Sequence, residues 1–186
     1  MNIFKIKLGE KEKEILKHIG LSVVALSFIF MPKASEILQL FPELNPRKKK
    51  DYYQYKYKAK RIIKRLEEKD VIYLSKDKIK LTKTGKKLLK LIDSQNLMIK
   101  KPNKWNKKWS IIAYDIPNTK KAERDYFRYK LKELGFCKIQ KSLWTIPYKC
   151  SQEIAVLSKI IGISPFVIYM TADHVPNEKQ LIKIYF

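Results

Sequence analysis

The sequence predicts an α+β protein with an N-terminal winged helix-turn-helix in residues 1–93 and a ferredoxin-like βαββαβ domain in residues 109–186. Three observations support this fold class. The first part reads as three helices, a short hairpin and a closing helix, whereas the second part has the order β-α-β-β-α-β. Between the two parts, residues 94–108 are polar, basic and contain proline without a sustained period, which is typical of a linker.

Three helices are expected in the first part. They cover residues 10–30, residues 33–41 and about residues 51–69. The apolar run Ile19–Met31 has 13 residues, fewer than the roughly 20 that cross a bilayer, so we expect a buried helix rather than a membrane anchor. No cleavable signal pattern precedes Pro32, and a cytoplasmic protein without a membrane partner is expected.

The third helix has an apolar stripe and a basic face. At steps of about 100° per residue, the stripe that should face the core contains Tyr55, Ala59, Ile62, Ile63 and Leu66. The opposite side collects the residues expected to contact DNA, namely Lys50, Tyr53, Gln54, Tyr57, Lys60, Arg61 and Lys64. Cations suit phosphates, and amide or guanidinium groups suit base edges. The alternative is an ordinary solvated face, but no acid appears on this side before Glu67.

A hairpin and a fourth helix complete the first part. Residues 71–74 and 78–82 alternate as short strands joined by a polar turn, and residues 83–93 form the closing helix. Lys76 and Lys78 lie at or beside the tip of this hairpin. A wing in this position reaches the DNA backbone or the minor groove, so both lysines are candidate DNA contacts.

Composition favours a polyanionic partner. The formal net charge is +23, which points to double-stranded DNA first and to an anionic membrane surface second. A lysine-rich codon bias could also raise the charge, but it would not place cations on particular faces. Five glycines form no phosphate-cradling loop, so an ATPase or a dinucleotide enzyme is not expected. The two cysteines are not arranged as a zinc site or a disulfide framework.

The second part predicts a sheet with two helices on one face. Strands are expected at residues 109–116, 136–140, 142–148 and 165–172, and helices at residues 120–135 and 151–162. Residues 181–186 are a possible additional edge strand. The other face of the sheet would be open, and Tyr114, Trp144 and Tyr169 are the side chains expected to close it against a second copy. A homodimer is therefore predicted.

Several short motifs in the second part carry a family resemblance. They are Asp115-Ile116-Pro117, Arg124-Asp125 with Arg128, Leu134-Gly135-Phe136, and Gln140 with Ser142 and Trp144. Together they resemble the central domain of the PaaX-type phenylacetate repressors, which is itself similar to the small ferredoxin-like CRISPR adaptation endonuclease, CRISPR-associated protein two. PaaX-type repressors carry a further C-terminal domain, which the chain is expected to lack. The resemblance therefore identifies no small-molecule effector.

The resemblance gives Asp115 two interpretations. In the nuclease family the matching aspartate ends the first strand, and two copies approach across the dimer axis to hold a divalent metal. Asp115 is accordingly the candidate catalytic and metal-binding residue, and Mg²⁺ the metal, if the chain is a nuclease. Alternatively, Asp115 is a turn residue between strand and helix. Dimer or phosphate contacts are expected from Arg124, Arg128, Gln140, Ser142 and Trp144.

These observations predict a homodimeric, DNA-binding transcriptional regulator, a repressor by the resemblance, that requires no cofactor. The alternative from another class is a Mg²⁺-dependent phosphodiesterase or CRISPR-adaptation-like endonuclease that uses a dimer pair of Asp115. A third possibility is a nonspecific nucleic-acid or scaffold protein. The sequence does not identify the operator or the regulated genes.

Overall fold

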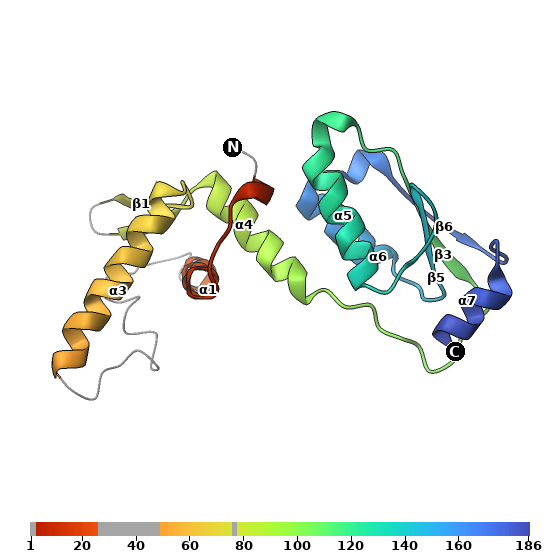
Figure 1. The fold of residues 1–186 in the computed structure, drawn as a ribbon, viewed down its shortest axis with the longest axis horizontal. Helices are drawn as coiled ribbons and strands as arrows, with labels where there is room; N and C mark the ends of the chain where they lie inside the picture. Colours follow the sequence, from red (N-terminus) through yellow and green to blue (C-terminus); the bar gives the residue numbers. More distant parts are fainter. Residues whose placement is uncertain (1–2, 26–48, 76–77) are drawn as a thin grey trace. The chain divides into compact units, whose positions relative to one another are not determined.

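The computed structural model describes residues 3–25, 49–75 and 78–186. The chain divides into two compact units, Met1–Asp93 and Ser94–Phe186. Each unit is described by itself below, and Figure 1 shows both. In the described part of the chain, no helix is both long and apolar enough to cross a membrane.

The first unit contains helices and one hairpin. Its elements are the 3-10 helix η1 (Ile3–Lys5), α1 (Glu10–Ala25), α3 (Lys49–Glu68), β1 (Ile72–Ser75), β2 (Lys78–Leu81) and α4 (Lys83–Asp93). The strands pair antiparallel, with Ile72 opposite Leu81. The predicted third helix, hairpin and closing helix are thus confirmed, while the predicted helix at residues 33–41 lies outside the described residues.

One hydrophobic core joins these elements. Leu16 of α1, Leu66 of α3 and Ile72 of β1 are at most 1% exposed and belong to the same buried cluster. The start of α4 is tied to this core by Thr82, whose hydroxyl accepts a hydrogen bond from the Gly85 backbone N–H at 2.9 Å. A Cβ at Gly85 would lie 2.0 Å from the Val71 carbonyl oxygen, so only glycine permits this close approach.

A partly buried ion pair connects α1 to the residue that follows α3. The Lys69 ammonium donates a hydrogen bond to Glu12 Oε2 at 2.7 Å, and the Gly9 backbone N–H donates to the same oxygen at 2.8 Å. Burial by itself would raise the pKa of Glu12, but these two hydrogen bonds and the positive charge of Lys69 outweigh it, so the pKa is lowered. The Glu12 carboxylate therefore fixes the first turn of α1 against α3.

The second unit has a four-stranded antiparallel sheet. Its elements are β3 (Trp109–Tyr114), α5 (Lys121–Glu133), β4 (Cys137–Gln140), β5 (Leu143–Ile146), α6 (Ser151–Ile161), β6 (Val167–Ala172) and α7 (Glu178–Tyr185), with three short 3-10 helices, η4 (Ser94–Asn96), η5 (Asn118–Lys120) and η6 (Ser164–Phe166). The strand order is β4-β5-β3-β6. Element order and strand order together are those of a ferredoxin-like sheet, as predicted.

Different helices cover the two faces of this sheet. Helices α5 and α6 lie on one side of the strands and α7 lies on the other (Figure 1). Along β3, Ile112 and Tyr114 belong to the side of α5, because the Tyr114 ring contacts Phe127 of α5 at 5.5 Å between centroids. The alternate residue Trp109 packs instead with Leu181 of α7.

The C-terminal segment corrects one prediction. Residues 181–186 are not an edge strand, because Glu178–Tyr185 form helix α7. Leu181, Ile182 and Tyr185 recur at helical spacing and pack on Trp109, whereas Ile184 is 65% exposed. The Tyr185 hydroxyl donates to the Gly135 carbonyl at 2.8 Å and accepts a hydrogen bond from the Cys137 backbone N–H at 3.1 Å. A short apolar run with one lysine allowed a strand, but the tertiary contact selects the helix.

The segment that was predicted to be a linker packs against the second unit. Residues 94–108 belong to the second unit, and Trp105 packs edge-on against Trp109 with 5.3 Å between ring centroids. The Ser94 hydroxyl lies 3.4 Å from the Tyr126 hydroxyl of α5. The segment is therefore held at both ends by contacts within the second unit.

Candidate nucleic-acid interface

Helix α3 presents a basic face to solvent. Ile63 and Leu66 are 6% and 0% exposed and face the core, as the apolar stripe predicts. On the opposite side Tyr57 is 68% exposed, and Lys60, Arg61 and Lys64 are also exposed. We call Tyr57, Lys60, Arg61 and Lys64 the basic face. Among the described residues, none of its three cations forms an ion pair.

Several other predicted contacts fall where side chains are not described. Lys50, Tyr53 and Gln54 lie within the bounds of α3, and Lys78 is the first residue of β2. Their side chains, and the whole of Lys76, lie outside the described residues. Their predicted contacts to DNA therefore remain predictions.

Two exposed residues were missed by the sequence reasoning. Arg65 is exposed and lies one turn after Arg61 on α3, so the i, i+4 spacing could have indicated it. Tyr73 is 44% exposed on β1, next to Leu74 at the same exposure. No periodic signal distinguishes Tyr73, since a strand of four residues is too short to define its solvent face.

In the second unit, Asp115 is exposed at the end of β3. Its backbone N–H donates to the Phe166 carbonyl at 3.0 Å, which holds the chain at the point where it leaves the sheet. Asp115 lies at a shallow, open depression that is also lined by Gln140, Ser142 and Phe166. The structure thus brings together three of the predicted site residues, Asp115, Gln140 and Ser142, on one surface.

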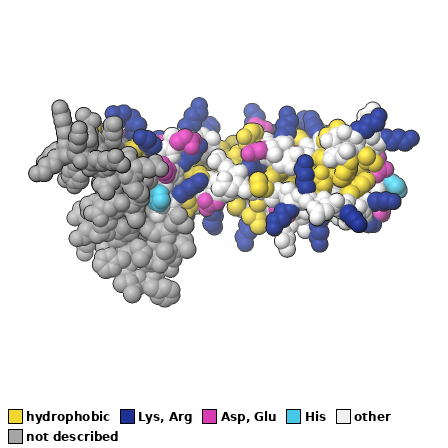
Figure 2. Space-filling view, turned by 90° about the horizontal axis from the view of Figure 1, so that it is seen from below, with side chains coloured by type: hydrophobic (Ala, Val, Ile, Leu, Met, Phe, Trp, Pro, Cys, Tyr) yellow, Lys and Arg dark blue, Asp and Glu magenta, His cyan; other side chains and the backbone are white. Residues whose placement is uncertain are grey.

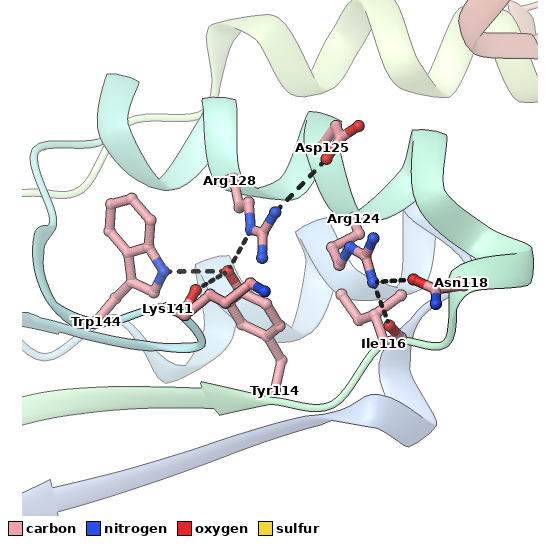
Figure 3. A network of polar contacts seen from close by, with 8 residues as sticks. All are labelled: Tyr114, Ile116, Asn118, Arg124, Asp125, Arg128, Lys141 and Trp144. Carbon is pink, nitrogen blue, oxygen red and sulfur yellow. Dashed lines mark hydrogen bonds and ion pairs between the residues drawn. The ribbon is translucent and has the colours of Figure 1, made fainter.

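A hydrogen-bond network under this surface centres on Tyr114 (Figure 3). The Tyr114 hydroxyl accepts hydrogen bonds from Arg128 Nε at 2.9 Å and from Trp144 Nε1 at 3.2 Å. It donates to the Lys141 carbonyl at 3.1 Å, and Arg128 also pairs with Asp125 at 3.6 Å. The guanidinium of Arg128 is therefore committed to contacts within the chain.

Arg124 supports the next turn of the chain. Its Nη1 donates to the Ile116 carbonyl at 3.1 Å and to Asn118 Oδ1 at 3.0 Å, as Figure 3 shows. Arg124 Nε is buried and has no hydrogen-bond partner in the described part of the chain. Arg124 and Arg128 thus fasten α5 to the two sides of Asp115, and both have a structural role besides the predicted phosphate or dimer contact.

The aromatic residues expected on an open sheet face lie elsewhere. Tyr114 and Trp144 are 5% and 2% exposed and lie on the side covered by α5. Tyr169 is on the same side, because it pairs with Ile112 in register and its hydroxyl lies 2.7 Å from the Ser110 hydroxyl. The prediction that these rings close the open face is wrong, and Trp144 is an interior residue rather than a surface contact. Alternation in each strand allowed either face, and the helices decided which one is buried.

The depression beside Asp115 is lined by one carboxylate, that of Asp115 itself. Mg²⁺ binds oxygen ligands and usually retains several waters with one or two carboxylates. Within the described ranges, no cluster of three or more His, Cys, Asp or Glu side chains could hold a metal ion. The predicted metal site of two Asp115 carboxylates from two copies remains a prediction.

The strand order, the antiparallel pairing and the two helices on one face define the second unit as a ferredoxin-like domain. Residues 102–182 match the family model described as the PaaX protein central Cas2-like domain. The match covers most of the second unit, and the resemblance of its motifs to the PaaX central domain is confirmed.

Other comparisons are more distant. No match was found among curated proteins. Among solved structures, the chain is similar to the uncharacterized protein Rv0674 from Mycobacterium tuberculosis, with 15% sequence identity and a TM-score of 0.41. The alignment covers 92% of this chain and 66% of that one, so the chain spans about two thirds of its neighbour's length.

Proposed function

We propose that the chain is a DNA-binding transcriptional regulator of the PaaX type that acts as a homodimer. The observation that carries this proposal is the basic face of α3, where three exposed cations have no ion-pair partner among the described residues. A net charge of +23 opposes compaction unless a polyanion neutralises it. A basic helix next to a β-hairpin is the arrangement by which winged helices approach the major groove and the flanking backbone.

An uncovered apolar area supports the proposal of a homodimer. On β6, Ile168 and Met170 are 60% and 42% exposed, and they pair in register with Ala113 and Ile111 on the side of α7. Helix α7 covers Trp109 but leaves Ile168 and Met170 exposed in the single chain. Contiguous exposed apolar side chains of this kind mark protein contacts, and a two-fold dimer would bury the same patch on both copies.

A mobility-shift series tests DNA binding. If a dimer neutralises about 6 to 10 phosphates, its affinity for duplex DNA falls by roughly 10³ to 10⁵ between 50 and 200 mM salt. Two-fold symmetry further predicts half-sites about 10 base pairs apart, or a multiple of that spacing. Binding that hardly changes with salt, or the selection of no sequence motif from a random DNA pool, would contradict the proposal.

The oligomeric state is tested separately. Sedimentation velocity of the full chain should give the mass of a dimer, and Ile168→Lys with Met170→Lys should shift it to a monomer. The pair Val156→Lys and Ile184→Lys, which changes two other exposed apolar residues, serves as the control and should leave the dimer intact. A wild-type chain that stays monomeric at every concentration rejects the dimer.

A second candidate function is Mg²⁺-dependent cleavage of nucleic acid. It is favoured by one observation, the exposed carboxylate of Asp115 at the end of β3 beside an open depression. Incubation of DNA and RNA with the protein and Mg²⁺ or Mn²⁺, with Asp115→Asn as control, distinguishes the two functions. Cleavage that disappears in the variant supports the nuclease, whereas DNA binding that is equal in both proteins without cleavage supports the regulator.

A further inference from the structure

The second unit carries its own basic surface, separate from α3. Five lysines occur in the segment 100–108, and no acid occurs between Asp93 and Asp115. Lys100, Lys101, Lys104 and Lys107 are exposed, and Figure 2 shows that dark-blue cationic side chains outnumber magenta acidic ones over the described surface in that view. We call residues 100–108 the basic turn.

The basic turn is anchored to the folded unit. The Trp105 ring stacks on Phe186 at 5.3 Å between centroids and meets Trp109 edge-on at the same distance. Trp105 Nε1 donates to the Lys108 carbonyl at 3.1 Å, which closes the turn. Lys107 has a φ of 58°, a conformation that a lysine rarely adopts, so the surrounding contacts impose it. The turn therefore holds its lysines in place, and less conformational entropy is lost when they bind a ligand.

The neighbouring acids are already paired. The Lys108 ammonium bridges to Asp173, and a hydrogen bond from Lys108 lowers the pKa of that carboxyl group. The Glu178 carboxylate accepts a hydrogen bond from Trp109 Nε1 at 2.8 Å, which lowers its pKa, and it also contacts His174. Among the described residues, no acid pairs with the other four lysines of the basic turn.

Helix α7 adds two exposed lysines to this basic surface. Leu181, Ile182 and Tyr185 of α7 pack on Trp109. Phe186, which follows α7, stacks on Trp105, so α7 and the basic turn are in contact. Lys179 and Lys183 are exposed on the outer side of α7, one turn apart. An outward row of exposed lysines on two elements that are packed together matches the phosphates of a nucleic-acid backbone better than it matches a single small anion.

We propose that the basic turn and the outer side of α7 form a second phosphate-contacting surface for duplex DNA. This inference rests on the proposed DNA-binding function. The surface would contribute affinity that depends little on base sequence, because its charged side chains are lysines, which pair with phosphates. Sequence selection would come from the first unit.

The test compares charge reversals in the full chain. Lys104→Glu with Lys107→Glu removes two cations of the basic turn. Lys121→Glu with Lys159→Glu makes the same change in charge at two exposed helical lysines away from the turn. Binding to a duplex of arbitrary sequence is measured between 50 and 300 mM salt by fluorescence anisotropy, and thermal melting verifies that both variants are folded.

The expected result is specific to the turn. Each lost phosphate contact removes about 0.9 from the slope of log affinity against log salt, so the turn variant should lose about 2 in slope and about 60-fold in affinity at 0.1 M salt. The Lys121 and Lys159 variant should change by no more than a few fold, because exposed charges farther than a Debye length are screened.

Other outcomes have distinct meanings. If the wild type binds and a charge reversal at Lys60, Arg61 and Lys64 weakens it, but the turn variant equals its control, the second surface is rejected while the proposed function stands. If the wild type binds no duplex at all, the proposed function fails. Lost affinity for single-stranded DNA with unchanged duplex affinity would also overturn the inference, and would assign the basic turn to single-stranded nucleic acid instead.

Discussion

The two units use their cations in different ways. On α3 of the first unit, Lys60, Arg61 and Lys64 project to solvent without an ion pair among the described residues. In the second unit, Arg124 and Arg128 donate hydrogen bonds to the turn beyond β3 and to Tyr114. Residues of the same charge are thus exposed without an ion pair in one place and act as internal supports in another. Only the hydrogen-bond and ion-pair partners of these cations distinguish the two groups.

The largest expected effect is a loss of stability that is confined to one of the two units. Phe127→Ala should lower the free energy of unfolding of the second unit by about 3 to 5 kcal/mol, because the ring is 0% exposed against Tyr114. Leu66→Ala should lower that of the first unit by about 2 to 5 kcal/mol for the same reason. Calorimetry should show two transitions, each moved by one variant. A single transition that moves equally in both variants would contradict independent cores.

Charge reversal on α3 should give the next largest effect. Changing Lys60, Arg61 and Lys64 together to Glu should weaken duplex binding by about 10² to 10³ and lower the salt slope by about 3, since three phosphate contacts are lost. The matched control reverses Lys86, Lys87 and Lys90, which are exposed on α4. Equal losses in both triple variants would show that total charge, rather than the basic face, determines affinity.

Removal of Arg128 tests whether a cation of the second unit supports the fold rather than DNA binding. Arg128→Ala deprives the Tyr114 hydroxyl of a charged donor at 2.9 Å, and we expect a loss of about 1.5 to 3 kcal/mol in the stability of the second unit. DNA affinity per folded molecule should not change. Anisotropy titrations below the melting temperature verify this, and a large loss of affinity without a change in melting would assign Arg128 to the DNA contact.

The smallest effect is a pH dependence of the first unit. Because the pKa of Glu12 is lowered by folding, its contribution to stability is fully present above the pKa of the unfolded chain. This contribution is lost as the pH falls through the lower folded-state pKa. Between about pH 5 and pH 3, the wild type should therefore lose more stability than Glu12→Gln. Melting curves that stay parallel across this range would show that the ion pair with Lys69 contributes nothing.

The order of secondary structure in the second unit was accessible from sequence. The strand and helix periodicities from Trp109 to Ala172 predicted β3 to β6 with their two helices, and the motifs around Asp115 predicted the PaaX-type domain. In the first unit, the stripe that ends in Ile63 and Leu66 predicted which side of α3 is buried. These successes have one cause, since hydrophobic periodicity and local backbone preferences act within a few residues.

Contacts between distant residues were decided by the tertiary structure alone. Residues 181–186 are apolar except for Lys183, which allows a strand as well as a helix, yet packing on Trp109 and the hydrogen bonds of Tyr185 select helix α7. Likewise, Tyr114 and Trp144 could have lain on either face of the sheet until α5 covered one of them. The sequence by itself determined most elements of the second unit and its similarity to the PaaX central domain. Burial, the partners of each arginine and the anchoring of the basic turn depend on residues far apart in the chain, which local patterns do not encode.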